Sequence, residues 1–185
     1  MSDSNGPDIA RLATQRMSSP PMTSHAAVEA RALVKHYRGR DGVVEAVRGV
    51  DLRIEAGEVF GFLGPNGAGK STTVRMLTTL LSITSGKAFV AGIDVAAKPD
   101  EARLRMGVAL QEAGLDPRQT GRELLVLQSR LFGMSSDDAT ARAQQLLELV
   151  DLTDAADRRI KGYSGGMKRR LDLASALVHE PEVLF

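Results

Sequence analysis

The chain has 185 residues, and its 24 Lys and Arg against 23 Asp and Glu leave a formal net charge of +1. Hydrophobic residues make up 43% and charged residues 25%, which is ordinary for a globular domain and excludes a strongly basic nucleic-acid binder, an acidic tail or a disordered polymer. The absence of cysteine excludes disulfides and thiolate metal sites, and the length suits one domain with a sizeable core.

The N-terminal part of the chain divides into a leader and two strands. Residues 1–26 are rich in small polar side chains and contain a Ser-Ser-Pro-Pro run, which predicts a disordered leader. Strands are expected over 28–37 and 43–54, with a turn rich in Gly and Arg between them. In the second strand, apolar and charged residues alternate from Val50 to Glu55, as in a half-buried strand.

A continuous apolar run covers 58–63 and predicts a central strand that is covered on both faces. A helix is expected from about 70 to about 81. A hairpin is expected over 87–95, and a second buried strand over 105–110.

Helical patterns follow. Thr120 and Glu123 have the spacing of a capping box, in which each side chain bonds the backbone N–H of the other residue. Leu124, Leu127, Leu131 and Phe132 then recur on helical spacing. Further helices are expected over 137–149 and 165–178. The chain then returns toward the sheet at 183–185.

The clearest motif is Gly64-Pro-Asn-Gly-Ala-Gly69-Lys70-Ser71, which matches the P-loop pattern G-x-x-x-x-G-K-[ST] between a predicted strand and a predicted helix. The glycines let the backbone N–H groups turn toward phosphate oxygens, and the helix start adds its positive end. Lys70 would place its charge against the β- and γ-phosphates, and the Ser71 hydroxyl can ligate Mg²⁺.

Three weaker signals each have a structural alternative. Tyr37, at the end of the first strand, could stack on an adenine ring or simply pack on the surface. Gln111, directly after the strand at 105–110, could reach Mg²⁺ or an attacking water, or could be a structural hydrogen-bonding residue. Ser164, Gly165 and Gly166 precede a helix, where they form either a second anion site or a plain N-cap.

Together these residues resemble the ATP-binding subunit of an ABC transporter. The P-loop, the glutamine loop at Gln111 and the signature motif at Ser164–Met167 come in the order of that family. The signature reads Tyr-Ser-Gly-Gly-Met where the commonest form is Leu-Ser-Gly-Gly-Gln. The run from Tyr163 to Ala174 is similar to bacterial drug-resistance cassettes of the daunorubicin-exporter type.

The resemblance, which covers about residues 28–185, implies an α/β fold of the P-loop NTPase class. Its parts would be a mostly parallel core sheet, an N-terminal antiparallel β subdomain and a helical insert. The cassette would occupy 27–185, with the helical subdomain at about 112–160.

The resemblance also implies a role for each motif. Lys70 and Gln111 would act in catalysis, with Gln111 sensing the γ-phosphate and coupling the helical insert to a membrane partner. Ser71 and Gln111 would bind Mg²⁺, and Ser164 with the glycines after it would bind the γ-phosphate held by another cassette. The implied nucleotide-binding residues are Tyr37, Gly64, Asn66, Gly67, Ala68, Gly69, Lys70, Ser71, Thr72, Ser164, Gly165 and Gly166.

The implied cofactors are ATP and Mg²⁺. The implied partners are a second cassette, in a homodimer, and a separate membrane-spanning permease, with no nucleic acid. The implied location is cytoplasmic, peripheral on the inner face of the cell membrane. The expected function is the ATPase subunit of a bacterial exporter of a drug-like or other substrate. The alternatives are a non-transport ATP switch of the same superfamily and a nucleotide-binding remnant that lacks hydrolysis.

The sequence departs from the family at its end. The family places an Asp that supports Mg²⁺ and a Glu that polarises water after the strand at 183–185, followed by a switch histidine. Asp172, Glu180, Glu182 and His179 do not match those positions. We therefore expect a truncated cassette with negligible hydrolysis, because phosphoryl transfer relies on such positioning and charge stabilisation.

Overall fold

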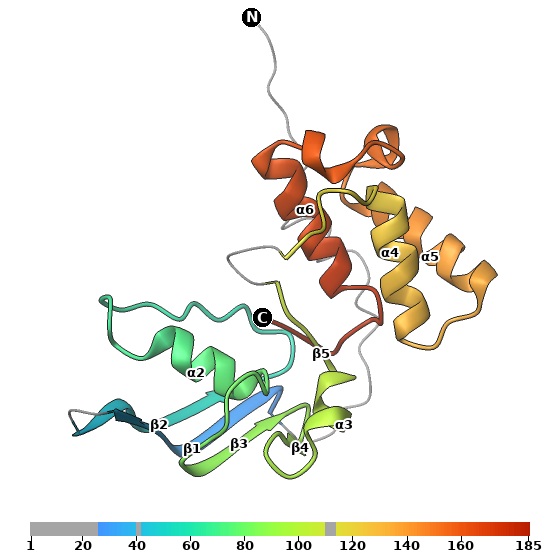
Figure 1. The fold of residues 1–185 in the computed structure, drawn as a ribbon. Helices are drawn as coiled ribbons and strands as arrows, with labels where there is room; N and C mark the ends of the chain where they lie inside the picture. The colour runs from blue at the N-terminus through green and yellow to red at the C-terminus, as the bar shows by residue number, and fades with distance from the viewer. Residues whose placement is uncertain (1–25, 40–41, 110–113) are drawn as a thin grey trace, which may run out of the picture.

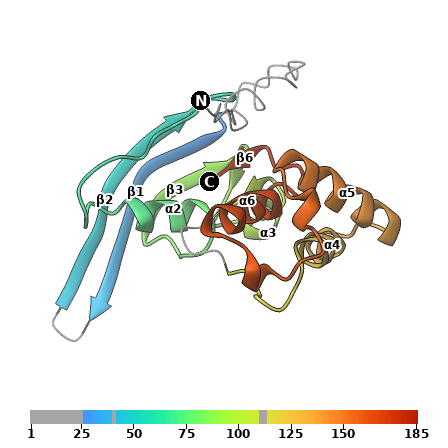
Figure 2. The same ribbon diagram turned by 90° about the horizontal axis from the view of Figure 1, so that it is seen from above.

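The computed structural model describes residues 26–39, 42–109 and 114–185 (Figure 1). The predicted leader, except for Ala26, and the predicted site residue Gln111 lie outside the described residues. The described chain forms an antiparallel sheet with a helix against it and a group of helices beside a short parallel sheet (Figures 1 and 2).

The antiparallel sheet has four strands in the order β2-β1-β3-β4, and its hairpin β1-β2 extends well beyond the rest of the molecule (Figure 2). The predicted N-terminal β subdomain and the 87–95 hairpin are therefore confirmed. In that second hairpin Ala91 and Gly92 both have positive φ (49° and 75°), as a tight two-residue hairpin turn requires. The strands are β1 (Val28–Gly39), β2 (Gly42–Ile54), β3 (Ser85–Val90) and β4 (Ile93–Asp94).

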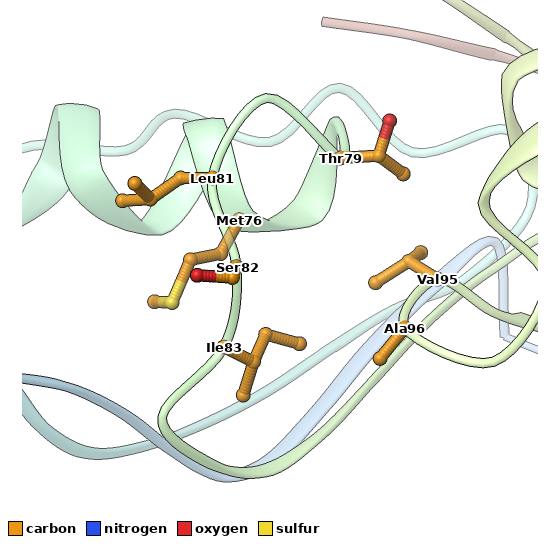
Figure 3. Close-up of a pocket in the computed structure, with 7 residues that line it drawn as sticks. All are labelled: Met76, Thr79, Leu81, Ser82, Ile83, Val95 and Ala96. Atoms are coloured by element: carbon orange, nitrogen blue, oxygen red, sulfur yellow. The ribbon is translucent and has the colours of Figure 1, made fainter.

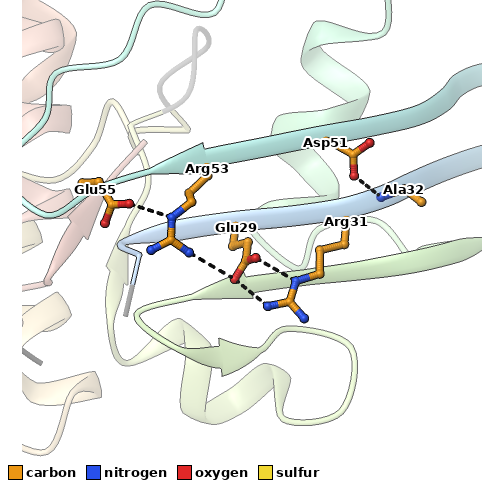
Figure 4. A network of polar contacts seen from close by, with 6 residues as sticks. All are labelled: Glu29, Arg31, Ala32, Asp51, Arg53 and Glu55. Carbon is orange, nitrogen blue, oxygen red and sulfur yellow. Dashed lines mark hydrogen bonds and ion pairs between the residues drawn. The ribbon is translucent and has the colours of Figure 1, made fainter. Parts of the chain in front are cut away.

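The long hairpin contains an irregularity that side chains stabilise. The register between β1 and β2 shifts beside Ala32, whose φ is 44°. Asp51 on β2 accepts a hydrogen bond of 2.8 Å from the Ala32 backbone N–H (Figure 4). Exposed ion pairs of Arg31 with Glu29 at 2.7 Å, and of Arg53 with Glu55 at 2.6 Å, lie along the same two strands.

Helix α2 (Lys70–Leu77) begins where the sequence predicts but ends four residues early. Thr79 adopts a φ of 62°, and the Leu81 N–H bonds back to the Arg75 carbonyl at 3.0 Å, so the chain reverses after the helix. The helix packs on the sheet and shares its hydrophobic core, which comprises Val28, Ala30, Leu33, Val47, Met76, Leu77, Ala88, Val90, Val95, Ala102 and Met106.

The predicted central strand at 58–63 is wrong. Within the described residues this segment pairs with no strand, and Val59, Phe60 and Leu63 are 103%, 49% and 92% exposed. A buried strand requires backbone partners on its edges and layers on both faces, and a continuous apolar run supplies neither by itself.

The parallel sheet is shorter than expected. The strand predicted at 105–110 appears as β5 (Met106–Gly107), which pairs in parallel with β6 (Val183–Leu184). Helix α3 (Pro99–Arg103) leads into it. In the described residues these two strands are the whole parallel sheet, so the fold keeps the α/β class with a reduced parallel core.

Three helices form the second hydrophobic core: α4 (Gly121–Leu131), α5 (Ser136–Leu149) and α6 (Gly165–Ala176). Short 3₁₀ turns at Thr153–Ala155 and Ile160–Gly162 connect α5 to α6. The core comprises Leu124, Leu125, Ala143, Leu146, Leu147, Val150, Leu152, Ala156, Ile160, Tyr163, Leu171, Ala174 and Val178. Because α6 contributes to it, the proposed subdomain limits of about 112–160 stay a prediction.

The capping box at the start of α4 is confirmed, with bonds of 2.8 and 3.1 Å between Thr120 and Glu123. The predicted apolar face is partly wrong, because Leu127 and Leu131 are exposed and Leu125 is buried instead. Among the described residues, no helix has the length and apolar character to cross a membrane.

Candidate nucleotide-binding site

The glycine-rich loop has the backbone conformation that the sequence predicts for a phosphate cradle. Gly64, Gly67 and Gly69 have φ values of 152°, 83° and 85°, which side-chain-bearing residues rarely adopt. Asn66, Gly67 and Ala68 lie exposed at the turn of the loop. The loop is therefore held open to solvent by its glycines.

The start of α2 leaves backbone donors available. Gly69 is the N-cap residue and has no side chain that could bond them. The Thr73 N–H bonds the Gly69 carbonyl at 2.8 Å, so the N–H groups of Lys70, Ser71 and Thr72 precede the first intrahelical bond. These groups and the positive helix end favour an anion here.

The backbone of Gly69 lies so close to strand β2 that no side chain fits between them. A Cβ on Gly69 would lie 2.5 Å from the Ala46 carbonyl oxygen and 3.2 Å from the Val47 side chain on β2. The loop and helix start are thus packed against the long hairpin at a position that only glycine fits.

The Lys70 side chain folds back over the loop. Its Nζ donates to the Gly64 and Pro65 carbonyl oxygens, each at 2.7 Å. These two neutral acceptors hold the ammonium beside the cradle. A phosphate would offer it charged acceptors at the same place, and charge-assisted bonds are roughly twice as strong as neutral ones.

Tyr37 lies on the same hairpin as the residues that contact Gly69. It pairs with Val44, two residues before Ala46, and its side chain is 41% exposed. The ring is thus available to a ligand near the cradle, although an exposed strand residue is also what simple surface packing predicts.

Ser164 is the N-cap of α6, and its Oγ accepts a bond of 3.2 Å from the Met167 N–H. The capping alternative is therefore confirmed, and the phosphate role stays a prediction. Among the described residues, apart from its chain neighbours and the backbone of its own helix, no heavy atom lies within 4 Å of a Cβ built on Gly165. Packing therefore does not require glycine at that position, although glycine weakens a helix relative to alanine.

The two glycine motifs do not share one pocket in the chain. Helix α6 packs beside α4 and α5, whereas α2 lies on the antiparallel sheet, well separated from them (Figure 1). The P-loop and the Ser164 motif therefore lie on different parts of the described chain.

The carboxylates at the end of the chain are engaged in ion pairs. Asp172 pairs with Arg169 at 3.2 Å, and Glu182 pairs with Arg105 at 2.6 Å. Burial raises the pKa of Asp172 above its ordinary value, and the charge of Arg169 opposes that rise.

Sequence reasoning missed one charged residue near the site. Lys35 on β1 is only 8% exposed, and its Nζ lies 5.3 Å from the centroid of the Tyr37 ring. A signal was present, because Leu33, Lys35 and Tyr37 alternate along one face of a predicted strand, where a lysine between an apolar and an aromatic residue is unusual.

The family model for ABC transporters matches residues 47–185, which include the P-loop and the Ser164 motif. The chain belongs to the ABC transporter family. It is 50% identical over 159 residues to the daunorubicin/doxorubicin resistance ATP-binding protein DrrA of Streptomyces peucetius, covering 86% of this chain and 47% of that protein. It is 46% identical over 150 residues to the Nod factor export ATP-binding protein I of Burkholderia lata, covering 81% and 49%.

The chain thus spans about half the length of the curated relatives it matches. Among solved structures, it is similar to the ATP-binding cassette MJ0796 in a dimeric state bound to ADP and Pi. That similarity has a TM-score of 0.76 at 26% identity and covers 85% of this chain and 72% of the other. The P-loop NTPase class expected from the sequence is therefore confirmed.

Proposed function

We propose that this chain is the ATP-binding part of a bacterial ABC exporter, acting with a separate membrane permease. The observation that carries the proposal is the start of α2, where Lys70 and three backbone N–H groups that precede the first intrahelical bond lie at a glycine-built loop within a chain of this family. Relatives named for drug resistance and Nod factor export support the exporter reading and not the non-transport switch.

Each part of the cradle has a task in nucleotide binding. Lys70 would exchange its two carbonyl partners for the γ-phosphate, and the N–H groups from Asn66 to Thr72 would bind the other phosphate oxygens. Tyr37 would stack on the adenine ring. Ser71, exposed in the first turn of α2, would hold Mg²⁺, which neutralises the phosphate charge. Gln111 keeps its proposed role at the γ-phosphate.

A second copy of the chain would complete the site. Because α6 lies apart from α2, Ser164, Gly165 and Gly166 would bind the nucleotide of the partner copy, closing two nucleotides between two chains. The complex would lie on the cytoplasmic face of the membrane. From the relatives' names, the exported molecule is proposed to be a drug-like or other substrate.

The test is calorimetric titration of the 185-residue chain with Mg·ATP. We expect a binding signal that Lys70→Ala abolishes or weakens at least tenfold, because the variant loses the side-chain charge that Lys70 would place on the phosphates. Lys98→Ala is the matched control, because this exposed lysine pairs with Glu101 away from the loop. Equal affinities in the two variants would overturn the proposal.

A remnant that binds nucleotide poorly or not at all would give no Lys70-dependent signal in the same titration. Self-association measured by sedimentation with and without Mg·ATP tests the second copy, and Ser164→Ala should weaken the nucleotide-dependent dimer. The expectation of negligible hydrolysis stays a prediction, and steady turnover by the 185-residue chain would contradict it.

A further inference from the structure

A buried ammonium group lies between the long hairpin and the chain that follows α2. Lys35 is 8% exposed, and its Nζ donates to the Ser82 carbonyl oxygen at 2.7 Å and lies 3.2 Å from the Ser82 hydroxyl. A buried lysine loses hydration and side-chain freedom, so an apolar residue would fill this position at a lower cost in stability.

The charge faces the ring of Tyr37. Lys35 and Tyr37 are two residues apart on β1, so their side chains lie on the same side of the strand. The Nζ lies over the ring at 5.3 Å from its centroid, within the range of a cation–π interaction. One face of the ring is therefore occupied by the ammonium, and the remaining 41% exposure is available to a ligand.

The anchor of the ammonium belongs to the segment that leaves α2. Ser82 lies close to Met76 of that helix, at the wall of a cavity of about 280 Å³ (Figure 3). Two more bonds join this segment to β1, from the His36 N–H to the Thr84 hydroxyl and from the Thr84 N–H to the Val34 carbonyl, each at 3.0 Å.

The two ends of α2 are thus both fixed to the hairpin that carries Tyr37. Its start contacts β2 at Ala46 through Gly69, and the segment after its end holds Lys35 through Ser82. Because the phosphate cradle forms the start of that helix, the position of the ring relative to the cradle depends on both attachments.

We propose that Lys35 is a positioning residue that fixes the Tyr37 ring relative to the P-loop helix, leaving the ring's other face for an adenine base. The inference rests on the proposed nucleotide-binding function. It predicts that Lys35 contributes to binding through the base and not through the phosphates.

The test compares two ligands that differ in the base, Mg·ATP and Mg·tripolyphosphate, by calorimetric titration. Lys35→Met keeps the length and removes the charge, so we expect ATP affinity to fall about three- to tenfold, the size of one partly desolvated cation–π contact. Tripolyphosphate affinity should stay within about twofold of the unmodified chain. Lys35→Arg keeps a cation over the ring and should recover most of the ATP affinity.

Lys87→Met is the matched control, because Lys87 is an exposed lysine on the neighbouring strand β3. Two results would overturn the inference: a Lys35→Met variant that binds ATP as Lys87→Met does, or one that loses affinity for both ligands in equal proportion. If Lys35→Met fails to fold in a thermal melt, Ser82→Ala replaces it. Removing one partner of the ammonium should then lower ATP affinity selectively, and an unchanged ratio of the two affinities would overturn the inference.

Tyr37→Ala separates this inference from the proposed function. Suppose that the higher affinity for ATP than for tripolyphosphate disappears in Tyr37→Ala but stays in Lys35→Met. The base then stacks on Tyr37 as proposed, and the proposed role of Lys35 is wrong. If Tyr37→Ala leaves that advantage intact, stacking itself is wrong. If the unmodified chain binds neither ligand, the proposed function fails.

Discussion

Two glycines of the proposed site differ in whether the surrounding structure leaves room for a side chain. Gly69 combines a φ of 85° with the Ala46 carbonyl 2.5 Å from where a Cβ would stand. Gly165 has open space around its Cβ position among the described residues. The first glycine is required by the fold of this chain, whereas packing in the described residues does not require the second.

This contrast gives a prediction for stability. Gly69→Ala should lower the free energy of unfolding by more than about 1 kcal/mol, because alanine disfavours the left-handed conformation and its Cβ collides with β2. Gly165→Ala should leave it unchanged or raise it by up to about 1 kcal/mol. Urea unfolding of both variants measures the difference, and equal stabilities would contradict the account of Gly69.

At the scale of elements, local signals in the sequence predicted local structure well. The capping box at Thr120 and the N-cap at Ser164 form as expected, because their bonds close within four residues. The start of α2 follows from the glycine loop in the same way. Such features need no partner from elsewhere in the chain.

Features that depend on distant partners could not be predicted. The run 58–63 has the composition of a buried strand, yet strand formation needs an adjacent backbone that composition does not specify. Likewise, Leu125 rather than Leu127 is buried on α4, because the direction from which α5 and α6 pack decides the buried face. In the site, the contact of Lys35 with Ser82 joins residues 47 apart in sequence.

The capping box provides the test at this scale. Thr120→Ala should destabilise the chain by about 1 kcal/mol, since it leaves the Glu123 N–H without its acceptor at a helix start. Thr120→Ser keeps the hydroxyl oxygen and is the control. It should lower the free energy of unfolding by much less. Thermal or urea unfolding measures both, and equal losses would show that the methyl group and not the cap matters.

At the scale of the whole molecule, His179 lies where the two hydrophobic cores meet. Its ring stacks on Phe132 at the end of α4, with centroids 4.0 Å apart, and its Nε2 bonds the Met106 carbonyl of β5 at 3.0 Å. Burial lowers the pKa of His179 below its ordinary value of 6.5, and the nearby charge of Arg142 lowers it further.

A pH dependence of stability follows. Because the folded state holds His179 neutral, the unfolded chain binds more protons near pH 6, so unfolding becomes easier as the pH falls. Neutral His179 makes its full contribution to the free energy of unfolding above about pH 6.5, and this contribution is lost as the pH falls through the folded-state pKa. Melting temperatures between pH 8 and pH 5 should fall less in His179→Gln than in the unmodified chain. His36→Gln, which alters a half-buried histidine beside Glu45 on the long hairpin, is the control, and parallel curves for all three proteins would refute the assignment.

The close approach at Gly107 has a mechanical consequence. A side chain on this residue of β5 would collide with the carbonyl of Ala176 at the end of α6, so strand and helix meet there backbone to backbone. Helix α6 runs 12 residues back from this point to Ser164, and its buried Leu171 and Ala174 tie it to α4 and α5. Its length is about 18 Å, so a rotation of about 10° of the three packed helices about Gly107 would move Ser164 by about 3 Å, the span of one hydrogen bond.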